Sequence, residues 1–191
     1  MTTVPRILAA AMELFGTQGF EATSIRQIAE RCELTDAAVL YHFGSKRRIL
    51  AAIWNEVFED GPESDVDPAA SVAEQVDRIV ALALTDTAMR DAEARLMVRQ
   101  TLAGDCDAID LRARRLAAWK GSLEGLFLRA YPADQAALRA DALTMLLTGC
   151  VLRAQIELGH EFAQRCRDLE YQQQVQGLAR TLVPAPYREA V

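Results

Sequence analysis

The amino-acid sequence predicts an all-α protein, and three features of the sequence support this. Apolar side chains recur at spacings of three and four, which is the period of a helix with one buried face. No segment alternates Val or Ile with polar residues, as a half-buried strand would. Gly and Pro number only ten and six among 191 residues, so long helices can run between them.

The first helix is expected from Thr3, as N-cap with Pro5 in the first turn, to Phe15. A second, short helix should begin at a Thr23 cap, because apolar residues follow at i, i+3, i+4 and i+7: Ile25, Ile28, Ala29 and Cys32. After an interruption at Glu33, Thr35 should cap a third helix that ends near Phe43.

Gly44 is expected to close the third helix and Ser45 to cap a fourth, which continues to about Asp60. The polar segment 61–68 contains Gly61, Pro62 and Pro68 and is typical of a linker. Five further helices are predicted at 69–85, 88–103, 106–130, 134–158 and 167–182.

Composition and charge narrow the function. Hydrophobic residues make up 51% and charged residues 25%, as in globular proteins, so a disordered or collagen-like chain is excluded. The net charge is −6, but residues 1–54 hold six basic and five acidic side chains, and the acidity belongs to residues 55–191. The N-terminal part can therefore approach a polyanion.

We expect a cytoplasmic protein with no membrane partner, no metal and no cofactor. No apolar run reaches the ~18 residues that cross a bilayer, and Arg6 and Glu13 flank an alanine-rich stretch that does not resemble a signal peptide. The four cysteines and the two histidines lack metal-ligand spacing, which favours reduced thiols.

Two short helices separated by a tight turn are typical of a helix-turn-helix DNA reader, whose second helix enters the major groove. On a helix over 35–43, Val39 and Phe43 share one face and should pack inward. The residues left outward are Asp36, Ala37, Tyr41 and His42.

Several spaced elements follow one another in residues 6–54: Ala11-x-x-Leu14-Phe15, Gly19-Phe20, Thr23-Ser24-Ile25-Arg26-x-Ile28-Ala29, Leu34-Thr35 and Val39-x-Tyr41-His42-Phe43-x-Ser45-Lys46-x-x-x-Leu50. In this order they resemble the DNA-binding domain of the TetR (tetracycline-repressor-like) transcriptional regulators. The resemblance implies a three-helix helix-turn-helix domain over 1–48 and a larger helical ligand-binding and dimerisation domain over 49–191. It also implies a sequence-specific regulator, in most cases a repressor that a small-molecule inducer releases from a palindromic DNA operator.

The resemblance also implies roles for single residues. Ser24 would offer a hydroxyl and backbone N–H groups to a phosphate, as helix N-termini do. Tyr41 and His42 would bond phosphates along the groove wall, and Lys46 would meet one at the first turn of the fourth helix. Thr35 would cap the reader helix and touch DNA.

The sequence departs from the family pattern where specificity is set. Glu33 replaces the usual glycine of the turn, Leu40 stands at a commonly aromatic position, and residues 36–40 contain no Arg, Lys, Asn or Gln to read a base. Arg26 could reach a guanine, Ala37 a thymine methyl and Asp36 a cytosine amine. Otherwise DNA shape sets the preference.

Each of these residues also has a simpler interpretation. Arg26 can be a solvated surface residue, and Asp36 a first-turn acid that favours the helix dipole. The Tyr41-His42-Phe43 run can be an aromatic plug.

The later helices are expected to hold a dimer interface and an inducer site. Two-fold pairing places two readers on one side of DNA, and apolar faces on the last two helices could supply the interface: Leu138, Met145, Gly149, Leu152, Leu169, Val175, Leu178 and Leu182. The inducer would be enclosed by Trp54, Phe58, Met89, Met97, Trp119 and Phe127, with Gln100 or Arg99 as an orienting polar group. Both sets are also compatible with an ordinary core.

The sequence also bears on two rival functions, an enzyme and a partner-binding protein. An enzyme is disfavoured because no Ser/His/Asp order, phosphate-binding glycine loop or carboxylate cluster can be placed. A helical partner-binding protein with a vestigial DNA reader stays open, because the predicted reader helix carries few base-reading side chains.

Overall fold

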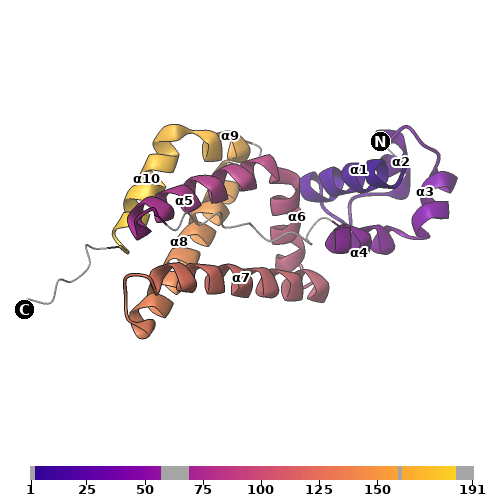
Figure 1. Ribbon diagram of the computed structural model, residues 1–191. Coiled ribbons are helices and arrows are strands. Elements are labelled where there is room, and N and C mark those ends of the chain that lie inside the picture. The colour runs from indigo at the N-terminus through magenta and orange to yellow at the C-terminus, as the bar shows by residue number, and fades with distance from the viewer. Residues whose placement is uncertain (1–2, 57–68, 159–160, 184–191) are drawn as a thin grey trace, which may run out of the picture. The chain divides into compact units, whose positions relative to one another are not determined.

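The computed structural model describes residues 3–56, 69–158 and 161–183 (Figure 1). Every regular element in these ranges is a helix, as predicted. The helices are α1 (Thr3–Thr17), α2 (Ile25–Arg31), α3 (Asp36–Phe43), α4 (Lys46–Glu56), α5 (Val72–Met89), α6 (Asp91–Leu102), α7 (Cys106–Phe127), α8 (Ala133–Leu158), α9 (Phe162–Arg167) and α10 (Leu169–Arg180). No helix in the described ranges is both long enough and apolar enough to cross a membrane.

The chain divides into two compact units. Unit 1 comprises Met1–Asp60 and Asp91–Arg114, and unit 2 comprises Gly61–Arg90 and Arg115–Val191. Unit 1 therefore adds α4, α6 and the start of α7 to the three N-terminal helices, because these later helices supply core side chains such as Ile53 and Leu96. Compactness alone does not define a domain, so the expected boundary after residue 48 stays a prediction.

Within unit 1, α1 and α6 approach each other closely at Gly16. A methyl group placed on Gly16 would lie 2.7 Å from the carbonyl oxygen of Ala92, which is closer than side-chain carbons come to such atoms. At the next residue, Thr17, the carbonyl oxygen accepts a hydrogen bond from Arg99 Nη2 of α6 at 3.1 Å. Glycine is therefore required at position 16 by the packing of α6 on the first helix.

Unit 2 is a separate bundle in which α5 and α8 both contact α9 and α10. Its core contains Phe127, Leu143 and Phe162, each fully buried. Arg180 forms a two-pronged ion pair with Asp77, at 2.6 and 2.9 Å, which joins α10 to α5. These contacts hold α10 against the bundle along one face and leave its other face outward.

The structure corrects two details of the predicted elements, and a third lies outside the described residues. The N-cap of α2 is Ser24 and not Thr23, which is 2% exposed and donates its hydroxyl to the carbonyl of Gly19. Six residues between α8 and α10 form α9, which was not predicted because so short a segment shows no helical period. The described part of α4 ends at Glu56, and the linker expected at 61–68 lies outside the described residues.

Candidate nucleic-acid interface

The third helix is a two-turn rod with one anchored face. Thr35 Oγ1 accepts a hydrogen bond from the backbone N–H of Ala38 at 3.2 Å, and Gly44, with a φ of 73°, ends the helix by donating to the carbonyl of Leu40. Val39 is fully buried in the core of unit 1. The helix is therefore fixed at both ends and along one side, and Figure 1 shows it at the edge of unit 1.

The residues predicted to face outward on this helix are exposed. Tyr41 is 87% exposed, and its ring meets that of His42 edge-to-face with centroids 5.5 Å apart. Asp36 and Ala37, at the start of the helix, are exposed as well. Phe43 is half-buried against the core of unit 1, so of the three aromatic residues it alone forms part of a core plug.

The turn before α3 bends through a left-handed residue. Glu33 has a φ of 53°, which a residue with a Cβ adopts at a cost in energy. Two hydrogen bonds hold the turn: Leu34 N–H donates to the carbonyl of Ala29 at 2.8 Å, and Arg6 Nη2 donates to that of Cys32 at 2.7 Å. The turn therefore accommodates a residue with a Cβ at a left-handed position, where glycine would be free of strain.

At the start of α2, Ser24 forms a reciprocal cap with Gln27. Ser24 Oγ accepts from the backbone N–H of Gln27 at 3.2 Å, and Gln27 Oε1 accepts from the backbone N–H of Ser24 at 2.8 Å. Sequence reasoning missed this role of Gln27, although Ser and Gln three residues apart are a readable signal. The cap leaves Ser24 exposed beside the N-terminal end of α2.

Arg26, the candidate base reader, is restrained by a neighbour on its own helix. Its side chain is 78% exposed, and its Nε donates to Glu30 Oε1 at 2.8 Å. The hydrogen bond and charge of Glu30, and then the charge of Asp36 on α3, raise the pKa of Arg26. The ion pair with Glu30 uses only Nε of Arg26. Among the described residues, the two terminal nitrogens, which would bind a guanine, make no hydrogen bond.

Lys46 differs from its expected role. Its ammonium donates to the carbonyl oxygens of Phe20, Thr23 and Glu21, at 2.6, 2.9 and 3.3 Å, and lies 4.3 Å from the centre of the Phe20 ring. An ammonium has three hydrogens, and these three carbonyls use them all. In this conformation Lys46 ties α4 to the loop before α2 rather than presenting a cation to a phosphate. Spacing could not reveal this, because the partners lie more than twenty residues away.

The residues expected around an inducer are divided between the two units. Trp54, Met97 and Gln100 belong to unit 1, where Trp54 and Gln100 are buried and Met97 is partly buried. Met89, Trp119 and Phe127 belong to unit 2; Phe127 is fully buried, Trp119 is partly buried, and Met89 is 66% exposed. Arg99 is exposed and bonded to α1, and Phe58 lies outside the described residues. An inducer site at these positions stays a prediction.

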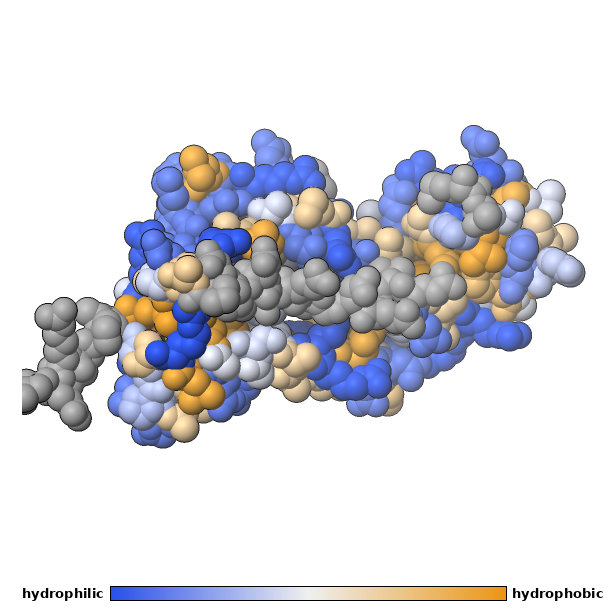
Figure 2. Space-filling model, viewed as in Figure 1, coloured by the Kyte–Doolittle hydropathy of each residue, from blue (hydrophilic) through white to orange (hydrophobic). Residues whose placement is uncertain are grey.

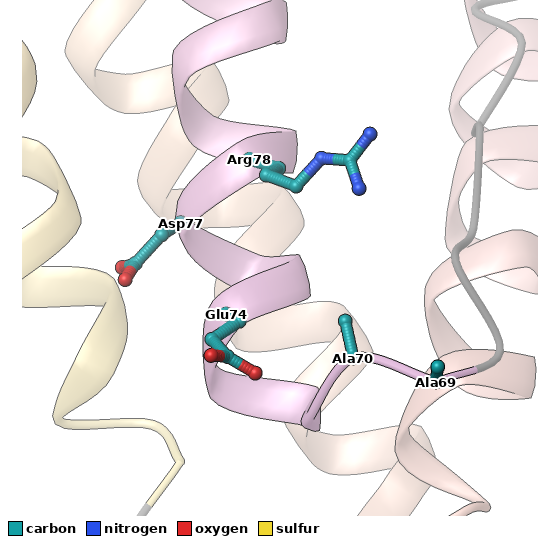
Figure 3. A pocket seen from close by; sticks show the side chains of 5 residues that line it. All are labelled: Ala69, Ala70, Glu74, Asp77 and Arg78. Atoms are coloured by element: carbon teal, nitrogen blue, oxygen red, sulfur yellow. The ribbon is translucent and has the colours of Figure 1, made fainter.

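One described hollow lies on unit 2 and offers little to an inducer. It has a volume of about 540 Å³ and is lined by Ala69, Ala70, Glu74, Asp77 and Arg78. Figure 3 shows Asp77 and Arg78 pointing to opposite sides of α5, and Asp77 is already paired with Arg180. Among the described residues no group of three or more His, Cys, Asp or Glu is placed to hold a metal ion.

The predicted dimer face is exposed along most of its length. Leu138 and Met145 on α8 are 68% and 71% exposed, and Leu169 and Leu178 on α10 are 68% and 53% exposed. A Cβ added to Gly149 would meet no atom within 4 Å. Leu152 and Leu182 are partly buried.

Val175 is the exception on this face. It is 2% exposed and packs in the core of its own unit, so it is not available to a partner.

Figure 2 shows a mostly hydrophilic visible surface with separate apolar patches, against which large exposed apolar side chains stand out.

Residues 7–53 match the family described as bacterial regulatory proteins, tetR family. These residues include α2, the strained turn and α3, so the match falls on the reader geometry described above. Residues 7–53 are a TetR-family domain. Sequence resemblance and structure thus agree on the identity of this part of the chain.

Relatives extend the likeness to different lengths. The HTH-type transcriptional repressor Rv3405c of Mycobacterium tuberculosis is 45% identical over 47 residues, which is 25% of each chain. The A-factor receptor protein of Streptomyces griseus is 31% identical over 115 residues, covering 58% of this chain and 41% of that protein. The chain thus matches from a quarter to about two fifths of the length of these two relatives.

The fold of the whole chain is that of solved TetR-like regulators. A transcriptional regulator from Rhodococcus sp. Rha1 superimposes with a TM-score of 0.71 over 95% of this chain and 96% of its own, at 20% identity. A TetR-like transcriptional regulator from Rhodococcus sp. RHA1 gives 0.70 over 94% of both chains, at 21% identity. Outside residues 7–53, this likeness establishes the fold and not the ligand.

Proposed function

We propose that the chain is a sequence-specific DNA-binding transcriptional regulator of the cytoplasm, and that it acts as a repressor. The observation that carries the proposal is the geometry of α3, whose core side is locked by Val39 while Asp36, Ala37, Tyr41 and His42 are exposed. A short capped helix with a free polar face fits the major groove. The similar repressor from Mycobacterium tuberculosis supports the direction of regulation.

The proposed contacts to DNA come from α2 and from α3 with its cap. Tyr41 and His42 at the end of α3, and Ser24 at the start of α2, would bond phosphates and set the register of the reader. Thr35 would donate its hydroxyl outward, because its oxygen accepts the capping bond and its hydrogen is not used there. Asp36 and Ala37 would face base edges, and Arg26 would reach a base once its terminal nitrogens turn to the groove.

The active form would be a homodimer on a palindromic operator. One reader gives few contacts, whereas two readers related by a two-fold axis bind successive major grooves about 34–36 Å apart. The exposed apolar side chains of α8 and α10 support this, because several large exposed apolar side chains on two helices that contact each other are typical of an interaction surface. Leu138, Met145, Leu169 and Leu178 would form its centre, with Gly149 allowing close approach.

We further propose that a small molecule releases the DNA. The similar A-factor receptor protein supports a ligand-responsive regulator. A ligand acts here only through its differential affinity for two states of the protein, so it must prefer a state in which the readers cannot both meet DNA.

A gel-shift series tests the proposal. Duplex DNA from the region upstream of the chain's own gene should be bound, and the affinity should fall steeply with salt because phosphate contacts release counterions. Absence of binding at low salt would instead favour a helical partner-binding protein with a vestigial reader. The alternative is supported by the acidic residues Glu30 and Asp36 beside Arg26, because their negative charges weaken the attraction of the exposed side of α2 and α3 for DNA.

A further inference from the structure

Five of the six basic side chains in residues 6–54 are bonded to protein acceptors. Six basic side chains lie between residues 6 and 54, all within the described range 3–56. Five make the following bonds: Arg6 with the Cys32 carbonyl, Arg26 with Glu30, Arg31 with both carboxylate oxygens of Glu13, Lys46 with three carbonyls and Arg47 with Asp105. These bonds use some or all of the donors of each group, so a phosphate would compete with a protein acceptor for these cations.

Arg48 differs from these five. Within the described part of the chain no hydrogen bond or ion pair engages its guanidinium, and the side chain is exposed. Its backbone N–H is the part that is bonded, to Ser45 Oγ at 3.2 Å, which fixes Arg48 in the first turn of α4. The Arg48 guanidinium is therefore carried by α4, and its N–H donors are unused within the described residues.

The side chain of Arg48 folds back over the end of the reader helix. Its Nη1 atom lies 3.4 Å, and its Cδ atom 3.9 Å, from the position of a Cβ on Gly44. Gly44 ends α3, directly after the exposed pair Tyr41 and His42 and the half-buried Phe43. The C-terminal end of a helix carries partial negative charge, which favours a cation there.

This placement suits a phosphate of the groove wall. A guanidinium offers several N–H donors in a planar fork and binds phosphate oxygens in pairs, which an ammonium cannot do. Gly44 has no side chain, so nothing at that position stands between the fork and a phosphate that approaches the end of α3. Tyr41 and His42 would then add their donors along the same strand.

We propose that Arg48 is the main phosphate-binding cation at the C-terminal end of the reader helix, in the role that the sequence suggested for Lys46. The proposal rests on the DNA-binding function proposed above. It assigns Lys46 to positioning, because its three carbonyl bonds hold α4 on the loop that leads into α2.

The test measures binding to a mixed-sequence duplex of about 30 base pairs, which is long enough for two readers one turn apart. Fluorescence anisotropy would give the affinity of the wild type, Arg48→Gln, Arg48→Lys and the control Arg47→Gln between about 50 and 200 mM salt. Arg47 is the matched control because it is the neighbouring residue, carries the same charge and is already paired with Asp105.

Arg48→Gln should reduce the slope of log affinity against log salt by about 0.9 for each reader that contacts the duplex. At 0.1 M salt this corresponds to a loss of about eightfold in affinity for each reader. Arg48→Lys should keep most of the slope, and Arg47→Gln should change it much less. The melting temperature should be the same in all four proteins, which separates a lost contact from a lost fold.

Two results would overturn the proposal and are distinguishable from each other. If the wild type shows salt-dependent binding and Arg48→Gln has the same slope as the wild type or as Arg47→Gln, the role of Arg48 is refuted and the DNA-binding function stands. If the wild type binds no duplex even at low salt, the proposed function fails, and the role of Arg48 fails with it.

Discussion

Replacing Glu33 with glycine should stabilise the protein by relieving the turn before the reader helix. Glu33 has a φ of 53°, and a side chain in this left-handed region costs about 1–2 kcal/mol. Glycine removes that cost but loses about 0.5–1 kcal/mol through the greater freedom of the unfolded chain. The ion pair lost with the carboxylate is long, at 4.0 Å, and Glu33 is 90% exposed in it, so it contributes little.

The expected net gain is about 0.5–1 kcal/mol in the free energy of unfolding, or roughly 1–4 °C in melting temperature for a chain of this size. Urea titration followed by circular dichroism would measure it, with an unchanged denaturant slope. Glu33→Ala is the matched control, because it removes the carboxylate and keeps the strained Cβ. If Glu33→Ala stabilises the protein as much as Glu33→Gly does, the gain comes from charge and the strain argument is refuted.

Three further predictions concern packing, assembly and base reading. Gly16→Ala should lower the free energy of unfolding by about 1 kcal/mol in the same titration, because the new methyl group strikes a carbonyl of α6, whereas Gly121→Ala, in open space on α7, should raise it by about 0.5–1 kcal/mol. Equal effects would contradict this. Met145→Asp should weaken self-association over a hundredfold in sedimentation experiments, because burying an unpaired charge in the interface costs about 3 kcal/mol or more. The control Leu102→Asp, at another exposed apolar residue, should leave self-association unchanged. A dimer that tolerates Met145→Asp must use another face. Arg26→Ala should relax the preference at one base pair by roughly 5- to 150-fold in a selection from random duplexes, and an unchanged preference would leave DNA shape as the explanation.

The fold could be predicted from the sequence because helical periodicity is a local property. The reader helix was placed correctly from its Thr35 cap to its closing Gly44. The cap of α2 was misplaced by one residue, because Thr23 and Ser24 are both good caps and the partner three residues on, Gln27, decides between them. The helix α9 was missed, because six residues are too few to show a period.

Long-range contacts could not be predicted, and they decide what several candidate residues do. Lys46 is a conspicuous cation in the sequence, yet its partners are backbone carbonyls in a loop that no pattern ties to it. Val175 continues an apolar stripe with Leu178 and Leu182, but the rotation of α10 turns Val175 into its own core. The aromatic and methionine residues proposed for an inducer fall in two units, and periodicity carries no information on that division.

The central claim is that two copies of α3 lie in successive major grooves of one operator. Hydroxyl-radical footprinting of the DNA upstream of the chain's own gene tests it most directly. We expect two protected patches on one face of the duplex, centred about one helical turn apart and related by a two-fold axis. A single protected patch without its symmetric partner, or protection on opposite faces of the duplex, would contradict it.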